Sequence, residues 1–486
     1  MQALDFSIFL LFTLGVVFFG CTFYRRGATA NDFVKASQSL PGWVVGMSIF
    51  ATYVSSISYI GYPGKAFAAD WNAFVFSLSI PIASWVAARW FVPFYRRHGS
   101  ASAYTFLEDR FGRWARLYAS ACYLLTQIAR MGSILYLLAV PMHILMGWDI
   151  HAVIIVTSLA VVLFSVMGGI RAVIWTDAVY GFLLIGGALL CLGLLIAEMP
   201  GGLSQAIDLA THAPEGNKLS LGELGADLTK STFWVCLIYG IFINLQNYGI
   251  DQNYVQRYHT AKTDRDARFS ALFGGWLFIP VSAVFFMIGT ALYSYYTAQP
   301  GLLPTEIGAK PDYVFPYFIV SNLPVGLRGL LIASIFAAGM STVSTSVTSA
   351  ATVLLTDYYK PFFPASSERR QVGVLRASCI LIGLLGCVVA IAMLNVASII
   401  DAWWTLSSIF SGGMLGLFLL GIVPSRISRG AALSGCICGV AVIGWISLAS
   451  MFSLPGIHLH EYLAIVLGTM TIFLTGFLLS KLLLRN

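Results

Sequence analysis

The stretch Phe336-Ala-Ala-Gly-Met-Ser-Thr-Val-Ser-Thr-Ser-Val-Thr-Ser349 places many hydroxyl groups inside a long apolar segment. On a helix, four of its hydroxyl residues follow the spacing i, i+3, i+4 and i+7 and form one stripe: Ser341, Ser344, Thr345 and Thr348. A column of oxygen atoms without soft ligands suits a hard monovalent cation. The competing interpretation is that small residues here merely let membrane helices pack closely.

The composition of the chain predicts an all-α membrane protein that crosses the bilayer many times. Of its 486 residues, 58% are hydrophobic and only 10% are charged. The first apolar run, Leu4–Cys21, lacks both a preceding basic region and a small-residue cleavage site, so we expect it to be a retained helix. The eight cysteines have no spacing typical of a metal site. The sequence also contains no nucleophile–base pair or phosphate-binding loop that would indicate an enzyme.

Windows of about 20 apolar residues predict thirteen transmembrane helices. Their centres lie near Leu14, Val54, Ile82, Leu135, Leu159, Ile185, Ile241, Val281, Ala338, Leu384, Phe410, Ala441 and Phe473. The loops after even-numbered helices hold few basic residues, namely Lys65, Lys218, Lys230, Lys310 and Arg328, whereas the opposite loops and the C-terminus are rich in them. This asymmetry puts the N-terminus outside and the C-terminus in the cytoplasm, and it explains the net charge of +7 without nucleic-acid binding.

The second predicted helix, residues 43–64, is expected to break near its middle. Three serines there precede two glycines and a proline. A broken helix is tolerated at membrane depth only where the freed backbone groups line a cavity or bind a ligand. Carbonyl groups around Ala51 and Val54 could bind a cation, and Ser55 and Ser58 could hold a polar substrate. The simpler alternative is a proline kink near the outer mouth with ordinary packing serines.

Arg130 lies roughly 21 Å along a predicted helix that begins near Arg116, well inside the hydrocarbon region. An arginine at this depth costs several kcal/mol and needs a partner. Its planar fork suits a carboxylate or a phosphate. Two interpretations remain open: Arg130 binds an anionic substrate, or it is satisfied by an internal salt bridge or the backbone.

Other polar residues in the apolar segments also allow two interpretations. Asp177 lies where the sixth helix begins, so the helix dipole could stabilise it; alternatively, it could bind a second cation with Ser344 and Thr345. Asn247 could line a pathway or hydrogen-bond to a neighbouring helix. Arg257 is interpreted as structural and close to the cytoplasmic boundary, and Asp401 as a candidate for an outer gate.

Several segments resemble the sodium:solute symporter family: Gly168–Asp177, the span opening at Trp43, Tyr104–Gly112, Asp251–Arg257 and Ala337–Thr342. The resemblance covers nearly the whole chain and implies one membrane domain, residues 1–486, with a LeuT-like fold. That fold has two inverted five-helix repeats, here residues 41–198 and 231–422. One extra helix precedes them (residues 4–24), and two C-terminal helices follow (residues 430–484).

The resemblance also implies where sodium binds. The usual sodium site of the family corresponds to the carbonyl groups of Ala51 and Val54 together with Ala338, Ser341 and Thr342. The family usually has Ser at the position of Thr342, and Thr keeps the hydroxyl group. Within the family, the chain is most similar to bacterial sialic acid symporters, which have a second sodium site. It corresponds to Asp177, Ser341, Ser344 and Thr345.

For the substrate, the resemblance implies that Arg130 binds the carboxylate of sialic acid beside Ser55 and Ser58. At Ala73 and Ser77 the chain departs from the Phe and Gln that sialic acid binders can carry, so the pocket wall differs. The sequence therefore predicts a sodium-coupled symporter that imports an organic anion, with sialic acid as the first candidate, by alternating access across the bacterial inner membrane.

We expect this symporter to act as a monomer surrounded by lipid, without nucleic acid. A symporter of a neutral sugar or a monocarboxylate, with Arg130 structural, is the main alternative. A membrane sensor or a channel is a third, and saturable uptake against a gradient would exclude the channel.

Overall fold

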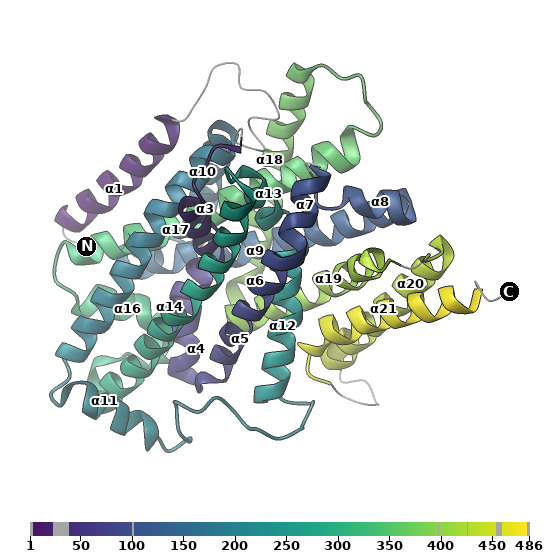
Figure 1. Cartoon of the computed structure of the whole chain (residues 1–486). Helices are drawn as coiled ribbons and strands as arrows, with labels where there is room; N and C mark the ends of the chain where they lie inside the picture. Colours follow the sequence, from purple (N-terminus) through teal and green to yellow (C-terminus); the bar gives the residue numbers. More distant parts are fainter. Residues whose placement is uncertain are drawn as a thin grey trace.

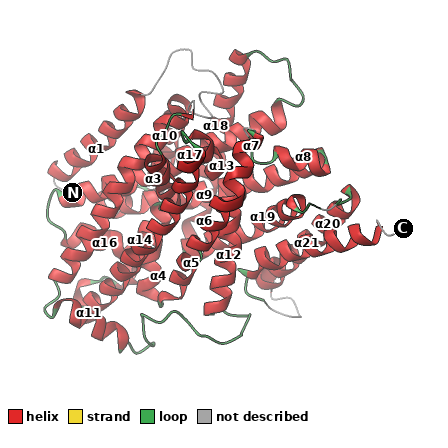
Figure 2. Cartoon of the chain, in the orientation of Figure 1, coloured by secondary structure: helices red, strands yellow, loops and turns green. Residues whose placement is uncertain are grey.

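The computed structural model describes residues 3–22, 38–99, 102–396, 398–424, 426–452 and 459–483. Figure 2 shows helices joined by loops throughout this part of the chain, which confirms the predicted all-α architecture. The described residues contain an isolated β-bridge between Leu40 and Ala261. The ends of the predicted first and last helices, at residues 23–24 and 484, and the basic residues Arg25, Arg26 and Lys35 lie outside the described residues.

The first half of the chain forms α1 (Ala3–Thr22), α3 (Gly42–Tyr53), α4 (Tyr62–Ala68), α5 (Val75–Leu78), α6 (Ile80–Val86), α7 (Val92–His98), α8 (Thr105–Phe111), α9 (Arg113–Met146), α10 (Ile150–Ala197) and α11 (Gly202–Thr211). The second half forms α12 (Phe233–Ile250), α13 (Gln252–Thr260), α14 (Asp264–Ala298), α15 (Thr305–Gly308), α16 (Pro311–Asn322), α17 (Leu327–Val353), α18 (Glu368–Ala392), α19 (Ile399–Ile422), α20 (Arg429–Phe452) and α21 (Leu463–Leu483).

In Figure 1, α1 lies at one edge of the bundle against α17, and α20 and α21 pack together beside α19 at the other edge. Between these edges, α10 contacts α3, α9, α14 and α17. Close packing here depends on glycine at one point. A Cβ atom at Gly289 of α14 would collide with the carbonyl oxygen of Pro63 in α4, so only glycine lets these two helices approach so closely.

Among the described residues, ten helices are long and apolar enough to cross a membrane, and the bent pair α3–α4 makes an eleventh. The chain is therefore a multi-pass membrane protein. Two shorter apolar stretches, Ala3–Val16 and Ile150–Leu163, fall below the length of these spans. The predicted count of thirteen is thus met only in part by helix length and composition.

The structure differs from the prediction in the segment that joins the fifth and sixth predicted helices. The sequence predicts a loop that contains Arg171 here, whereas the structure has one continuous helix, α10, of 48 residues. No proline interrupts this segment, and each glycine weakens a helix by only about 1 kcal/mol. A straight helix of this length would extend about 72 Å, more than twice the thickness of a bilayer core.

Candidate functional site

The predicted break in the second membrane helix is confirmed, and it lies between α3 and α4. Val54 ends α3 with an extended backbone (φ −79°, ψ 98°), a π-helical turn follows at Ile57–Gly61, and the two halves are bent by 55°. Among the described residues, no hydrogen bond ends on the carbonyl oxygens of Ala51 or Val54. The break therefore releases backbone oxygen atoms inside the bundle.

A cavity of about 40 Å³ lies beside this break. Ser55, Ser58 and Arg130, which the sequence predicts to bind substrate, all line it. The remaining lining residues are mostly aromatic or polar: Tyr53, Ile57, Tyr62, Phe76, Tyr239, Ile243, Asn247, Trp403, Trp404 and Ser407. Aromatic side chains combined with polar groups that orient the ligand are typical of small-molecule sites.

Arg130 reaches this cavity from α9 and is 8% exposed. Its Nη2 donates a hydrogen bond to the carbonyl oxygen of Thr52 at 2.7 Å, and its guanidinium carbon lies 5.9 Å from the ring centre of Trp403. In the part of the chain that the structure describes, no carboxylate forms an ion pair with Arg130. A guanidinium has five N–H donors, so one backbone carbonyl does not exhaust it.

Ala73 and Ser77, also predicted to bind substrate, do not line this cavity. Ala73 is buried in the short helical turn Trp71–Phe74. The hydroxyl oxygen of Ser77 lies 2.8 Å from that of Ser282 on α14. Neither side chain is among those around Arg130, and a role for them in the pocket wall stays a prediction.

The residues predicted for the first sodium site lie where α3 ends and on α17, and these two helices are in contact. Ala51, Val54, Ala338, Ser341 and Thr342 are each no more than 5% exposed. The hydroxyl group of Thr342 donates to the carbonyl oxygen of Ala338 at 3.0 Å. Because a hydroxyl oxygen also has two lone pairs, this bond leaves Thr342 able to act as a cation ligand.

The second predicted sodium site includes the carboxylate of Asp177 on α10, which Ser341 contacts. The Ser48 hydroxyl donates to its Oδ2 at 2.6 Å, and the Ser341 hydroxyl donates to its Oδ1. Within the described part of the chain, the hydroxyl group of Ser344 is buried without a hydrogen-bond partner, which is uncommon in protein interiors. With Thr345 beside Ser344 on α17, these oxygen atoms fit the preference of a hard cation.

The sequence interpretation missed the position of Arg257, which is 0% exposed. Its Nη2 lies 2.9 Å from Oδ2 of Asp177, so it forms a buried ion pair with a predicted sodium ligand. The two residues come from α13 and α10, and only the fold brings them together. No local pattern could have revealed this contact.

A second break, which the sequence interpretation also missed, separates α12 from α13. Asp251 has an extended backbone here (φ −72°, ψ 126°), and its side chain accepts a hydrogen bond from the backbone N–H of Asn253 at 2.8 Å. A signal was present, since Gly249 and Asp251 are helix-ending and helix-capping residues inside an apolar segment.

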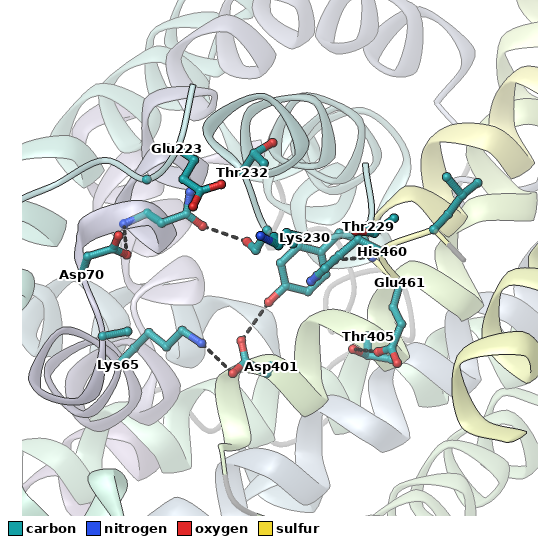
Figure 3. Close-up of a pocket in the computed structure, with 16 residues that line it drawn as sticks. Lys65, Asp70, Glu223, Thr229, Lys230, Thr232, Asp401, Thr405, His460 and Glu461 are labelled. Carbon is teal, nitrogen blue, oxygen red and sulfur yellow. Dashed lines mark hydrogen bonds and ion pairs between the residues drawn. The ribbon is translucent and has the colours of Figure 1, made fainter. Parts of the chain in front are cut away.

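A larger cavity of about 680 Å³, shown in Figure 3, lies beside Lys65 and Asp401. Lys65 Nζ donates to Asp401 Oδ2 at 2.7 Å, and the hydroxyl group of Tyr462 donates to Asp401 Oδ1 at 2.8 Å. Burial lowers the pKa of His460, which also lines this cavity, so its ring is neutral at neutral pH. The predicted gate residue Asp401 therefore joins α4, α19 and the segment before α21.

Aromatic side chains connect the walls of the two cavities, which share no lining residue. The rings of Tyr239 and Tyr462 stack at 4.7 Å between centres, and those of Phe76 and Trp404 stack at the same distance. Tyr462 lines the larger cavity, and the other three line the smaller one. These four rings form an aromatic layer between the walls of the two cavities.

A broken helix at membrane depth, buried oxygen atoms beside it and a cavity with a buried arginine are the features of a secondary active transporter. The family model described as "Sodium:solute symporter family" matches residues 33–439. The chain belongs to the sodium:solute symporter family; it is a sodium-coupled transporter and not an enzyme.

Named relatives and solved structures agree with this assignment. The chain is 32% identical to the sodium/sialic acid symporter SiaT of Proteus mirabilis, covering 97% of this chain and 94% of that protein. It is 31% identical to the sodium/sialic acid symporter NanT of Aliivibrio fischeri, covering 96% and 91%. It is also 28% identical to human sodium-coupled monocarboxylate transporter 2, covering 92% and 72%.

The solved structure of a substrate-bound, outward-open sodium-coupled sialic acid symporter matches the chain with a TM-score of 0.90 at 30% identity. The match covers 99% of this chain and 98% of that one. Mhp1, a nucleobase-cation-symport-1 family transporter, matches with a TM-score of 0.58 at 13% identity, covering 93% and 94%. The second match concerns the fold alone and agrees with the predicted LeuT-like architecture.

Proposed function

We propose that this chain imports sialic acid together with sodium, by alternating access across the bacterial inner membrane. The observation that carries the proposal is Arg130 beside Ser55 and Ser58 in one buried cavity. A guanidinium at this depth suits a carboxylate, and hydroxyl groups suit a polyol. The similarity to two sodium/sialic acid symporters supports this choice of solute.

Two sodium ions accompany the solute in this proposal. The first binds the carbonyl groups of Ala51 and Val54 with Ala338, Ser341 and Thr342; the second binds Asp177, Ser341, Ser344 and Thr345. Support comes from the unbonded carbonyl oxygens at the break in the helix and from the unpartnered hydroxyl of Ser344. Sodium at the first site would tie α3 to α17 and favour the substrate-ready state.

The proposed topology has thirteen crossings, with the N-terminus outside, in a monomer surrounded by lipid. Adding the short stretches Ala3–Val16 and Ile150–Leu163 to the eleven longer spans gives this number; α10, continuous in the structure, must then bend sharply between Leu163 and Ile170 to cross twice. The inverted repeats would be residues 41–198 and 231–422. The breaks α3–α4 and α12–α13 support this division, since each falls in the first helix of its repeat.

A monocarboxylate is a second candidate solute. A cavity of about 40 Å³ is far smaller than a nine-carbon sugar, and human sodium-coupled monocarboxylate transporter 2 is a relative of this chain.

Proteoliposomes with an inward sodium gradient distinguish the candidates when uptake of sialic acid, lactate and glucose is compared. We expect uptake of sialic acid only, and its loss when choline replaces sodium. Lactate uptake alone would favour the second candidate, and uptake unaffected by choline would contradict sodium coupling.

Replacing Thr342 with valine is expected to raise the sodium concentration for half-maximal uptake by about tenfold, because one oxygen ligand is lost. Thr342→Ser should behave like the parent protein. Thr348→Val is the matched control, since Thr348 also donates to the carbonyl group four residues earlier, at 2.9 Å. An equal effect of both valine substitutions would indicate a general helix defect and contradict the site.

Replacing Lys65 with glutamine is expected to raise the ratio of molecules open to the outside over closed molecules by about fivefold. The Lys65–Asp401 pair is partly exposed, at 28% and 36%, so it contributes about 1 kcal/mol at most. External thiol labelling of Ser407→Cys in the small cavity, followed by peptide mass spectrometry, measures the change. The Lys230→Gln variant is the control, because Lys230 lines the same larger cavity as Lys65. Unchanged labelling in the Lys65 variant would argue against Lys65 as a gate residue.

A further inference from the structure

Arg257 contacts four helices from a fully buried position. Its Nε donates to the hydroxyl oxygen of Ser48 on α3 at 2.7 Å, and its Nη1 donates to the carbonyl oxygen of Asn253 on α13 at 2.8 Å. Its Nη2 donates to Asp177 Oδ2 on α10 at 2.9 Å and to the hydroxyl oxygen of Thr345 on α17 at 3.2 Å. One side chain therefore holds two of the oxygen atoms assigned above to the second sodium ion.

We propose that Arg257 competes with this sodium ion for Asp177 and Thr345, and takes the place of the ion when the carrier is empty. The inference rests on the second sodium site of the proposed function. It adds that the site is shared between a mobile ion and a residue of the chain itself.

Charge is the first argument for competition. In the part of the chain that the structure describes, Asp177 is the carboxylate that pairs with Arg257, and its side chain is 1% exposed. A second buried carboxylate, Asp251, interacts with both Arg257 and Arg130, so these two carboxylates balance the two arginines. A sodium ion added to the intact pair would leave an unbalanced positive charge in a medium of low dielectric constant, which is strongly unfavourable.

The hydroxyl groups supply the second argument. Ser344 and Thr345 are neighbours on α17, yet Arg257 bonds to Thr345 and not to Ser344. The Ser344 hydroxyl is buried and has no partner among the residues that the structure describes. Sodium prefers several oxygen ligands and could use both hydroxyl groups, whereas the planar guanidinium reaches one of them. The oxygen set thus exceeds what the arginine uses.

The position of Arg257 connects this competition to movement. The backbone N–H of Leu40, just before α3, donates to the carbonyl oxygen of Thr260 at 3.1 Å. The backbone N–H of Lys262 donates to the carbonyl oxygen of Leu40 at 2.9 Å. With the Arg257–Ser48 bond, these contacts join α3 and α13 into one unit. The bonds from Arg257 to Asp177 and Thr345 hold α13 against α10 and α17, and sodium at the second site would release these two bonds.

A sodium titration of purified protein tests the proposal without measuring transport. Thermal shift, with choline replacing sodium at constant ionic strength, gives the sodium concentration for half-saturation. We expect Arg257→Gln to lower this concentration by about tenfold, because the ion no longer displaces a competitor. Arg116→Gln is the matched control, since Arg116 is also a buried arginine, with Nη2 2.6 Å from Asp357. A higher or unchanged value, or an equal change in the control, would overturn the proposal.

The second sodium site is checked separately by adding Ser344→Ala to both the parent protein and the Arg257→Gln variant. If the double variant no longer shows the tenfold lower half-saturating sodium concentration of Arg257→Gln, the result supports a site shared by sodium and Arg257. If Ser344→Ala has no effect in either background, the sodium site of the proposed function fails, and the competition fails with it.

A measurement on the parent protein keeps the proposal testable even if the Arg257 variant does not fold. Hydrogen–deuterium exchange is followed in the peptide covering Gln252–Thr260, with sodium or with choline. We expect sodium to increase exchange in α13 severalfold, because Arg257 releases its contacts with α10 and α17. Slower or equal exchange in sodium would overturn the proposal.

Discussion

Replacing Arg130 with alanine should lower the affinity for sialic acid by about a hundredfold or more. Truncating one partner of a buried, hydrogen-bonded charge pair costs about 2–5 kcal/mol, and about 1.4 kcal/mol corresponds to a factor of ten. Arg130 is 8% exposed, and it is the charged residue that lines the small cavity. Titration calorimetry in saturating sodium measures the change.

The experiment becomes specific for the carboxylate when a second ligand is included. An analogue with a hydroxymethyl group in place of the carboxylate should bind the parent protein about as weakly as sialic acid binds Arg130→Ala. The variant should no longer distinguish the two ligands, because the interaction that separates them is gone. Arg116→Ala, at a buried ion pair outside the cavity, is the control for unspecific effects. If Arg130→Ala still prefers sialic acid, the carboxylate is bound elsewhere.

Replacing Ser344 with alanine should remove most of the dependence of uptake on membrane potential. Two sodium ions and one monoanion move one net positive charge, which gains about 2.3 kcal/mol at 100 mV. This energy corresponds to about fiftyfold in accumulation. With one sodium ion the cycle is electroneutral, and this driving force disappears. Proteoliposomes with a fixed sodium gradient and a potassium diffusion potential measure accumulation at several voltages.

Stability offers an internal check on the same variant. The Ser344 hydroxyl has no hydrogen-bond partner in the described ranges of the chain, so its removal should leave the melting temperature in choline unchanged or raise it. Ser346→Ala is the matched control, because Ser346 is two residues away on α17 and its hydroxyl is likewise buried without a partner. The Ser346 variant should keep the full voltage dependence. Equal voltage dependence in both variants and the parent would refute a second sodium ion that depends on Ser344.

Features carried by neighbouring residues were predictable from the sequence. The break at Val54 follows from serines, glycines and a proline within one apolar segment, and the hydroxyl stripe of α17 follows from helical spacing. The burial of Arg130 follows from its distance along α9. The break at Asp251 was missed although Gly249 and Asp251 are helix-ending and helix-capping residues, because Asp251 and Arg257 were placed near the cytoplasmic boundary and not inside the bundle.

Contacts between distant segments were not predictable in the same way. Asp177 and Arg257 are far apart in the chain, and their ion pair exists only because α10 and α13 are packed together. The aromatic layer of Phe76, Tyr239, Trp404 and Tyr462 likewise combines four separate segments. Ser77 turned out to bond to Ser282 on α14, so it is not among the residues around the cavity.

The sequence by itself determined that the chain is an all-α, multi-pass membrane protein with a broken helix, an oxygen-rich helix and a deeply placed arginine. Hydrophobicity, periodicity and backbone chemistry act over short distances along the chain, so they can be read without the fold. The tertiary structure decided which groups bond to the carboxylate of Asp177 and which side chains line the cavity around Arg130. Such choices depend on how helices pack, because the energy of a buried charge is set by the groups that packing places around it.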